Sequence, residues 1–315
     1  MQVDPHFCPI IGVGASAGGL EAINEMLGAV EEGSELAFVI VQHLDPTHVS
    51  MMAELMDRRT TLNVRQIAGG ETVQPGHAYV IPPGNSLVIH DGVLTLEAFD
   101  EPRGVRRPID DFFMSLARDQ GANAACVILS GTGSDGAAGL RAIKERGGIC
   151  AVQQPDTARF DVMPMSAIGT GFVDFVLPPE KICERIATFF ANKDDAEGRT
   201  GSISDYIDEI CEVLKETVGH DFSGYKQSTL TRRIERRMYV LEITEPADYL
   251  ARIEADTLEC EALLRDVLIN VTSFFRDPET FKALDEYAVS DLIKRADAKR
   301  PIRCWVPGCS SGEEA

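Results

Sequence analysis

The sequence predicts an α/β fold with a doubly wound, mostly parallel sheet and an inserted antiparallel hairpin. A small all-α domain and a fragment of a second α/β domain are expected to follow. Three observations predict this order. Short apolar runs alternate with helical patterns from about residue 7 to 191, apolar residues then recur at helical spacing to about residue 271, and one last apolar run leads into a glycine-rich turn. The 315 residues suffice for two domains with separate cores.

The first apolar run, residues 9–14, predicts a short buried strand, and residues 18–23 begin a helix. Ser16 is therefore expected on a tight turn at the carboxyl end of this strand. The unpaired backbone N–H groups of the next helix's first turn would lie beside its hydroxyl group.

Two later predicted strands end beside residues that could act together with the Ser16 hydroxyl group. Residues 36–41 run into Gln42 and His43, and residues 124–129 run into a glycine-rich loop that holds Asp135. The carboxyl ends of parallel strands meet at one edge of the sheet, where α/β enzymes bind their substrates. Ser16, His43 and Asp135 could thus converge as nucleophile, base and base-orienting acid, as acyl transfer requires.

Residues 12–17 also fit G-x-G-x-x-A, the dinucleotide-binding fingerprint. That interpretation requires an acidic residue at the end of the second strand, but this strand ends in Gln42 and His43, and Asp45 lies beyond it. The glycine loop at residues 130–136 has no role in a dinucleotide site and favours a hydrolase. Helix capping remains an alternative role for both Ser16 and Asp135.

Residues 78–81, 86–89 and 93–96 predict three short strands, and Asp91-Gly92 is a strong hairpin signal. We interpret all three as an antiparallel ribbon inserted into the α/β layer. Residues 192–202 contain one apolar residue in eleven and predict a flexible linker with a span of about 18 Å. The first domain is therefore expected at residues 1–191, and the linker at residues 192–203.

The remaining sequence predicts an all-α domain at residues 204–285 and the truncated beginning of another domain at residues 286–315. Leu230, Ile234, Met238 and Leu241 recur at helical spacing, and further helices are expected at residues 248–255 and 258–271. Residues 302–306 predict a single strand before the glycine-rich turn. One strand cannot form a sheet, so the chain is expected to stop inside a third domain.

The composition excludes several classes of protein. A formal net charge of −20 argues against nucleic acid as a partner. No run of 18 apolar residues is present, so no membrane span is expected, and the start of the sequence lacks the pattern of a signal peptide. The scattered cysteines predict reduced thiols in the cytoplasm. The eight cysteines include no C-x-x-C pair, so neither a metal site nor a disulfide framework is expected.

Four segments resemble the catalytic segments of chemotaxis receptor methylesterases (CheB type): residues 14–19, 42–43, 129–139 and 160–168. The resemblance implies a cofactor-independent protein-glutamate methylesterase that acts on methyl-accepting receptor helices and can also deamidate glutamine. It assigns Ser16 as nucleophile, His43 as base and Asp135 as orienting acid. The oxyanion pocket is expected near Ala17 and the loop residues Gly131, Thr132 and Gly133. A non-catalytic docking module is an alternative.

Residues 231–238 and 269–277 resemble the helical domain of chemotaxis receptor methyltransferases (CheR type), and the last residues resemble that family's first S-adenosylmethionine-binding loop. The resemblance implies a natural esterase–transferase fusion. It assigns the following residues to the cofactor: Asn270, Thr272, Arg276, Gly308 and Glu313. The family's remaining strands are absent, so methyl transfer is not expected of this chain as given.

Four arginines, Arg232, Arg233, Arg236 and Arg237, fall on one helix face opposite an apolar stripe. This face is expected either to be solvated or to dock acidic receptor helices by charge attraction. The family's usual receiver domain has no room before the first strand, so control by phosphorylation at that point is not expected. The sequence does not indicate the receptor or the oligomeric state.

Overall fold

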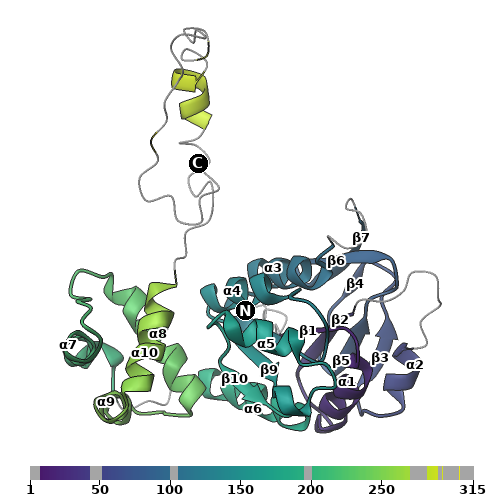
Figure 1. The fold of residues 1–315 in the computed structure, drawn as a ribbon, viewed down its shortest axis with the longest axis horizontal. Coiled ribbons are helices and arrows are strands. Elements are labelled where there is room, and N and C mark those ends of the chain that lie inside the picture. Colours follow the sequence, from purple (N-terminus) through teal and green to yellow (C-terminus); the bar gives the residue numbers. More distant parts are fainter. Residues whose placement is uncertain are drawn as a thin grey trace, which may run out of the picture. The chain divides into compact units, whose positions relative to one another are not determined.

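A computed structural model describes residues 8–42, 52–99, 106–194, 201–269, 282–289, 293 and 305. The chain divides into two compact units, Met1–Val267 and Leu268–Ala315. The first unit contains the sheet and most of the helices (Figure 1). In the second unit, the described residues include the helical turn Asp285–Val289. The predicted strand at residues 302–306 falls almost entirely outside the described residues.

The centre of the first unit is a seven-stranded sheet in which all the neighbouring strands are parallel. In spatial order its strands are β10 (Phe175–Leu177), β9 (Ile149–Gln153), β8 (Ala124–Ile128), β1 (Ile10–Ala15), β2 (Ala37–Gln42), β5 (His77–Val80) and β3 (Asn63–Gln66). The apolar runs of β1, β8 and β9 are buried along their whole length, because helices cover both faces of the sheet. The predicted α/β class is confirmed.

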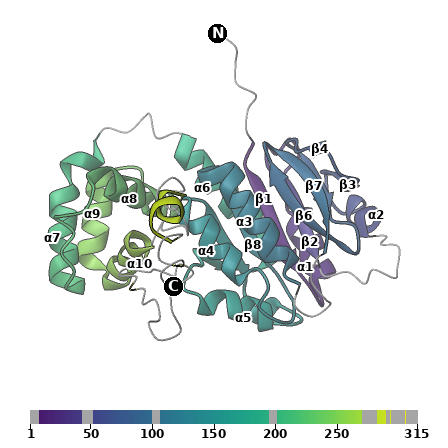
Figure 2. The ribbon, with the colours of Figure 1, turned by 90° about the horizontal axis from the view of Figure 1, so that it is seen from above.

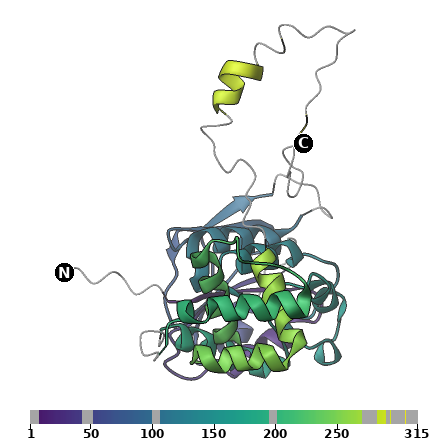
Figure 3. The same cartoon turned by 90° about the vertical axis from the view of Figure 1, so that its left-hand side faces the viewer.

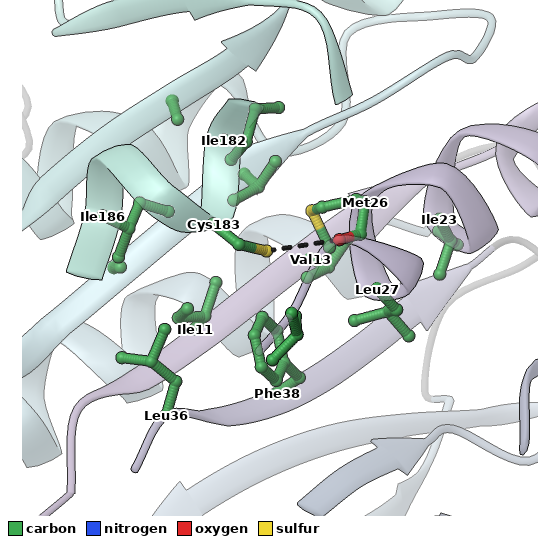
Figure 4. Packing of buried hydrophobic residues seen from close by; sticks show 14 of the residues in the cluster. Ile11, Val13, Ile23, Met26, Leu27, Leu36, Phe38, Ile182, Cys183 and Ile186 are labelled. Carbon is green, nitrogen blue, oxygen red and sulfur yellow. Dashed lines mark hydrogen bonds between the residues drawn. The ribbon is translucent and has the colours of Figure 1, made fainter. Parts of the chain in front are cut away.

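The helices on one face are α1 (Gly19–Gly28), α2 (Met52–Asp57) and α6 (Pro179–Asp194), and those on the other are α3 (Pro108–Gln120), α4 (Ala137–Glu145) and α5 (Val162–Gly169). Successive side chains of a strand enter opposite layers. Ile11 and Val13 contribute to the first core with Met26 and Ile186, whereas Ile10 contributes to the second. Figure 4 shows the first core at close range, and in Figure 2, which looks from above, α3 and α4 lie in front of the sheet.

The inserted hairpin is confirmed, but one of its predicted strands belongs elsewhere. β6 (Asn85–His90) and β7 (Val93–Ala98) pair antiparallel, with β4 (Glu71–Thr72) on the outer side of β7. Asp91 (φ 49°) and Gly92 (φ 71°) form the turn in the left-handed conformation that such hairpins require. The prediction that residues 78–81 join this ribbon is wrong, because β5 lies in the parallel sheet between β2 and β3.

The helical part consists of α7 (Ile207–Val218), α8 (Gln227–Leu241), α9 (Pro246–Ala255) and α10 (Thr257–Leu268), preceded by the 3₁₀ turn Ile203–Asp205. These helices, drawn in green in Figures 1 and 3, enclose a separate core around Phe222, Met238 and Leu263. The separate all-α core is therefore as predicted. Residues 192–194 of the predicted linker belong to α6, which ends at Asp194.

The basic face of α8 is not a solvent-facing surface, and this prediction is wrong for three of its four arginines. Arg233, Arg236 and Arg237 are 1%, 3% and 7% exposed, and Arg232 alone is exposed. Arg237 forms two hydrogen bonds with the Glu259 carboxylate, at 2.8 and 2.6 Å. The guanidinium groups are therefore already paired within the chain, and they cannot dock acidic receptor helices in this conformation.

Arg233 and Arg236 join α8 to the sheet domain. Arg233 donates to the Lys144 and Glu145 carbonyl oxygens at 3.1 and 3.2 Å, at the C-terminus of α4. Arg236 donates to the Gly148 carbonyl oxygen at 3.0 and 2.7 Å. The two Arg233 bonds reach carbonyl oxygens in the last turn of α4 and place positive charge at the negative end of its helix dipole.

A buried ion network, defined here as Lys144, Asp174, Arg236 and Asp266, completes this contact. Lys144 pairs with Asp174 at 3.1 Å and with Asp266 at 2.8 Å. Arg236 pairs with Asp266 at 2.8 Å and also with Asp174. Each of the four side chains is at most 4% exposed. Burial alone would raise the pKa of Asp174, but the charges of Arg236 and Lys144 outweigh it and hold that pKa well below its usual range.

The described part of the chain contains no helix long and apolar enough to cross a membrane. Its six cysteines are free thiols, including Cys126 and Cys150, which lie opposite each other on β8 and β9 with their sulfurs 3.5 Å apart. Within these residues no group of His, Cys, Asp and Glu is arranged to hold a metal ion.

Candidate active site

Ser16 directly follows β1, at the carboxyl edge of the sheet. Its amide donates to the Ser130 carbonyl oxygen at 3.0 Å, and its own carbonyl oxygen accepts from Gly19 at 2.9 Å. The turn continues through Gly18, whose φ of +69° favours glycine, and α1 begins at Gly19. The structure thus places Ser16 on the predicted tight turn, half-buried between the loop after β8 and the start of α1.

The glycine loop after β8 packs directly against Ser16. A Cβ atom at Gly131 would lie 2.9 Å from the Ser16 Cβ atom and would overlap the Met163 sulfur, so only glycine fits this position. The Gly131 amide donates to the Phe160 carbonyl oxygen at 3.0 Å. This bond corrects one predicted role, because the Gly131 N–H group is not available to an oxyanion.

Other backbone amides near Ser16 do remain available. Among the described residues, the amides of Ala17 and Thr132 have no acceptor. Thr132 and Gly133 are exposed, and the Gly133 carbonyl oxygen accepts from Ser166 Oγ at 3.3 Å, which ties the loop to α5. The predicted loop residues therefore lie around Ser16, with Ala17 and Thr132 as the candidate donors.

Asp135 is buried at the N-terminus of α3. Its two carboxylate oxygens accept from the amides of Ile109 and Asp110, at 3.1 and 3.0 Å. Asp110 Oδ1 in turn accepts from the Gly139 amide, in the first turn of α4, at 2.8 Å. Asp135 thus caps α3 and not α4, which follows it in sequence. The two N–H donors at the start of α3 fix the position of the carboxyl group that is predicted to orient the base.

Asp110, whose carboxyl group lies near that of Asp135, has a surrounding of its own. It is 2% exposed, and burial raises its pKa, to which the nearby charge of Asp135 adds. The amide of Gly139 and a long contact to Arg107, at 3.5 Å, oppose this shift only in part. The two carboxyl groups therefore occupy distinct electrostatic environments, although they cap adjacent helices.

The predicted base and the predicted cofactor residues lie outside the described residues. Gln42 is the last residue of β2 and pairs in register with Ala15, so the ends of β1 and β2 lie side by side. His43, which follows Gln42, is outside the described range, and the contact between Ser16 and His43 remains a prediction. Asn270, Thr272, Arg276, Gly308 and Glu313 are outside it as well.

The dinucleotide interpretation does not agree with the position of the glycines. Gly12 and Gly14 lie inside β1 and not in the turn where the fingerprint requires its first glycine. A Cβ atom at Gly12 would lie 2.8 Å from the Phe113 ring, and one at Gly14 would lie 2.5 Å from Ile109 Cγ2. These glycines allow α3 to pack closely on β1. This packing explains why both positions are glycine, with no need for a bound nucleotide.

Several site-building residues were not predicted from the sequence. Gln42 Nε2 donates to the Ser16 carbonyl oxygen at 3.1 Å. Ser130 Oγ donates to the Ala17 carbonyl oxygen at 2.9 Å and accepts from the Phe160 amide at 3.0 Å, and the Ser130 amide donates to Gln153 Oε1 at 2.8 Å. Polar residues at the ends of otherwise apolar strands, such as Gln42 and Gln153, are the signal that could have identified them.

Comparison with protein families divides the chain into three segments. Residues 11–186 match the CheB methylesterase family, residues 205–268 match the all-alpha domain of CheR methyltransferase, and residues 270–315 match the SAM binding domain of CheR methyltransferase. The second and third segments meet near residue 269, which lies before the division predicted at residue 285.

Two curated relatives and one solved structure are similar. An uncharacterized 104.1 kDa protein in the hypE 3′ region of Rhodobacter capsulatus is 36% identical over 289 residues, which is 84% of this chain and 30% of that protein. Protein-glutamate methylesterase/protein-glutamine glutaminase 2 of Pseudomonas aeruginosa is 37% identical over 177 residues, or 55% of this chain and 50% of that protein. The chain thus spans half or less of the length of these two relatives.

The solved structure is the Thermotoga maritima CheB methylesterase catalytic domain. It matches with a TM-score of 0.53 and 30% sequence identity, over 56% of this chain and 96% of that domain. The sheet, the turn at Ser16 and the matched segments lead to one conclusion: this chain belongs to the CheB methylesterase family, with its esterase domain fused to domains of the CheR methyltransferase family.

Proposed function

We propose that this chain is a protein-glutamate methylesterase that hydrolyses γ-glutamyl methyl esters on methyl-accepting chemotaxis receptors and deamidates glutamine by the same steps. One observation carries the proposal. Ser16 lies at the carboxyl end of a central strand, in contact with the glycine loop that ends in the buried carboxylate Asp135. The names of the relatives, which pair methylesterase with glutaminase, support the same reaction.

The proposed reaction is acyl transfer in two stages. Ser16 Oγ attacks the ester carbonyl carbon while His43 accepts its proton, and Asp135 orients the imidazole and stabilises the imidazolium. The intermediate's oxyanion accepts hydrogen bonds from the amides of Ala17 and Thr132. His43 then protonates the leaving oxygen, and methanol departs. With a glutamine substrate, the leaving group is ammonia.

In the second stage water hydrolyses the acyl-enzyme. His43 removes a proton from the water molecule, which attacks the acyl carbon, and then returns the proton to Ser16 Oγ. The products are a free glutamyl carboxylate and the restored serine. The proposed reaction uses no cofactor. The same proposal places the chain in the cytoplasm, which the free thiols among the described cysteines support.

S-adenosylmethionine is the cofactor that the matched CheR domain implies for a complete methyltransferase. The residues assigned to it lie outside the described part of the chain, so no geometry there supports a cofactor site. Methyl transfer is not proposed for this chain.

Replacement of the nucleophile tests the proposal. Ser16→Ala is expected to lower ester hydrolysis by at least ~10³-fold, because the triad acts as a unit. The measurement is release of tritiated methanol from a chemotaxis receptor fragment esterified with tritiated methyl groups. Ser134→Ala, an exposed serine in the same glycine loop, is the control and keeps its activity. Near-normal hydrolysis by Ser16→Ala would refute the nucleophile assignment.

A further inference from the structure

An exposed apolar surface lies beside Ser16. We define the rim patch as Phe160, Val162 and Met165, which are 38%, 50% and 54% exposed. The opposite side of the same segment is buried, since Met163 and Ala167 are each 1% exposed and pack into the core. α5 therefore packs on the core through Met163 and Ala167, while Val162 and Met165 stay about half exposed and Phe160 lies against the turn at Gly18.

The rim patch is attached firmly to the catalytic loop. The Phe160 backbone accepts from the Gly131 amide and donates to Ser130 Oγ, each at 3.0 Å. The Met163 amide donates to the Gly131 carbonyl oxygen at 3.1 Å. The Phe160 ring also lies 3.1 Å from the position that a Cβ atom at Gly18 would occupy, in the turn that contains Ser16. The segment that carries the patch is therefore joined by hydrogen bonds to the loop that packs against Ser16.

A protein substrate has to cover this surface. The ester carbonyl carbon must approach Ser16 Oγ to about 3 Å, and the ester lies at the end of a single glutamyl side chain. The substrate's backbone must then cross the rim within the length of that side chain. The charges beside the patch are of mixed sign, with Arg159 3.7 Å from Glu21 and Asp161 exposed. Apolar contact is consequently the main attraction that this part of the rim offers.

The shape of the rim favours a helix over an extended strand. β1 has partners on both sides, β2 and β8, so no unpaired strand edge is available at Ser16 for β-sheet addition. Val162 and Met165 stand three residues apart on α5 and form a ridge, which fits into a groove between the side chains of a second helix.

We infer that the rim patch is the docking surface for the substrate helix that carries the methylated glutamyl side chain. The inference rests on the proposed function and adds to it the residues that select a protein ester over a small one. The apolar stripe of the substrate helix packs on Val162 and Met165, with Phe160 next to the catalytic turn. Neither α5 side chain contributes to the triad or to the oxyanion donors.

The double variant Val162→Ser/Met165→Ser tests the inference with two substrates. The KM for the tritiated receptor ester is expected to rise roughly tenfold at unchanged kcat, because two exposed apolar contacts are lost. Hydrolysis of p-nitrophenyl acetate should stay within about twofold, since this ester does not reach the patch. Leu258→Ser, which removes an apolar side chain 72% exposed on α10, is the matched control and should change neither reaction.

A binding measurement separates docking from chemistry. In the Ser16→Ala background, calorimetric binding of the same receptor fragment should weaken roughly tenfold when Val162→Ser and Met165→Ser are added. An unchanged KM and unchanged binding would overturn the inference, as would equal losses on both esters. A wild-type chain that hydrolyses neither ester would contradict the proposed function instead, so the two failures are distinguishable.

Discussion

Asp110 and Asp135 show how position decides the role of a carboxyl group. Asp135 receives two backbone amides at the start of α3, whereas Asp110 receives one amide from α4 and a long contact from Arg107. The sequence places Asp135 directly before α4, and capping of that following helix was the alternative role considered for it. The structure assigns its carboxylate to α3, because the close packing of α3 against α4 brings the two N-termini together.

The raised pKa of Asp110 predicts a dependence of stability on pH. Burial and the charge of Asp135 keep this pKa above its usual 3.8, so the folded state binds the proton more tightly than the unfolded state. Folding stability from this group is therefore present below about pH 4 and is lost as the pH rises through the folded pKa. Asp110→Asn keeps an acceptor for Gly139 without the charge. It should raise Tm at pH 7, with a difference that shrinks towards pH 4.

Thermal unfolding followed by circular dichroism between pH 4 and 8 would measure this effect. Asp161→Asn, at an exposed carboxyl group before α5, is the control and should show no such trend. A lower Tm for Asp110→Asn at every pH would mean that the ionised carboxylate is needed as a cap.

At the scale of elements, the glycines of β1 set the distance between strand and helix. A Cβ atom at Gly14 would lie 2.5 Å from Ile109 Cγ2, inside a fully packed layer. Gly14→Ala is expected to destabilise the chain by about 1–3 kcal/mol through overpacking. Combining it with Ile109→Ala, which provides space, should cost less than the sum of the two single changes.

Urea unfolding would give these free energies. Gly169→Ala, where a Cβ atom would meet nothing within 4 Å, is the control and should be neutral or slightly stabilising. Additive costs for Gly14→Ala and Ile109→Ala would contradict a direct contact between the two positions.

An element could be predicted from the sequence where the residues that determine it are neighbours in the chain. β1, β2, β8 and the hairpin turn at Asp91-Gly92 were recognisable because apolar runs and turn residues are local signals. The assignment of β5 was wrong because Pro82-Pro83 and the hairpin follow it closely, and only its pairing with β2 and β3 distinguishes it from the hairpin strands. Parallel pairing joins residues far apart in sequence, so no local pattern reports it.

The residues of the candidate active site also divide into those with a local sequence signal and those without one. Ser16 and Asp135 could be predicted because each stands next to a strand end that the sequence marks. Gln42, Ser130 and Gln153 build the site through hydrogen bonds between separate segments. The arginines of α8 were misinterpreted for a related reason, because the helical pattern shows which side they share but not that Asp174 and Asp266 cover it.

At the scale of the whole molecule, the ion network makes the sheet domain and the helical domain one unit. Removing one member of a buried ion pair typically costs about 3–5 kcal/mol, because the remaining charge stays buried. We expect the wild-type residues 1–267 to unfold in a single cooperative transition. Arg236→Met should separate this transition into two by uncoupling α8 from Asp174 and the Gly148 carbonyl oxygen.

Differential scanning calorimetry would resolve the transitions. Arg232→Met, a change at the exposed neighbour of the same helix, is the control and should leave the single transition in place. A single transition in the Arg236→Met variant, shifted no more than that of Arg232→Met, would mean that the network does not hold the domains together.

The division of charges within the network has a consequence for how the two domains fold during synthesis. Lys144 and Asp174 both lie in the sheet domain, and Arg236 and Asp266 both lie in the helical domain, so each domain contributes one neutral pair. During synthesis the sheet domain leaves the ribosome first, and domains generally fold in that order. Its lysine and aspartate can neutralise each other while the helices are still being translated. The arriving helical domain then brings a second neutral pair, Arg236 with Asp266, to the first.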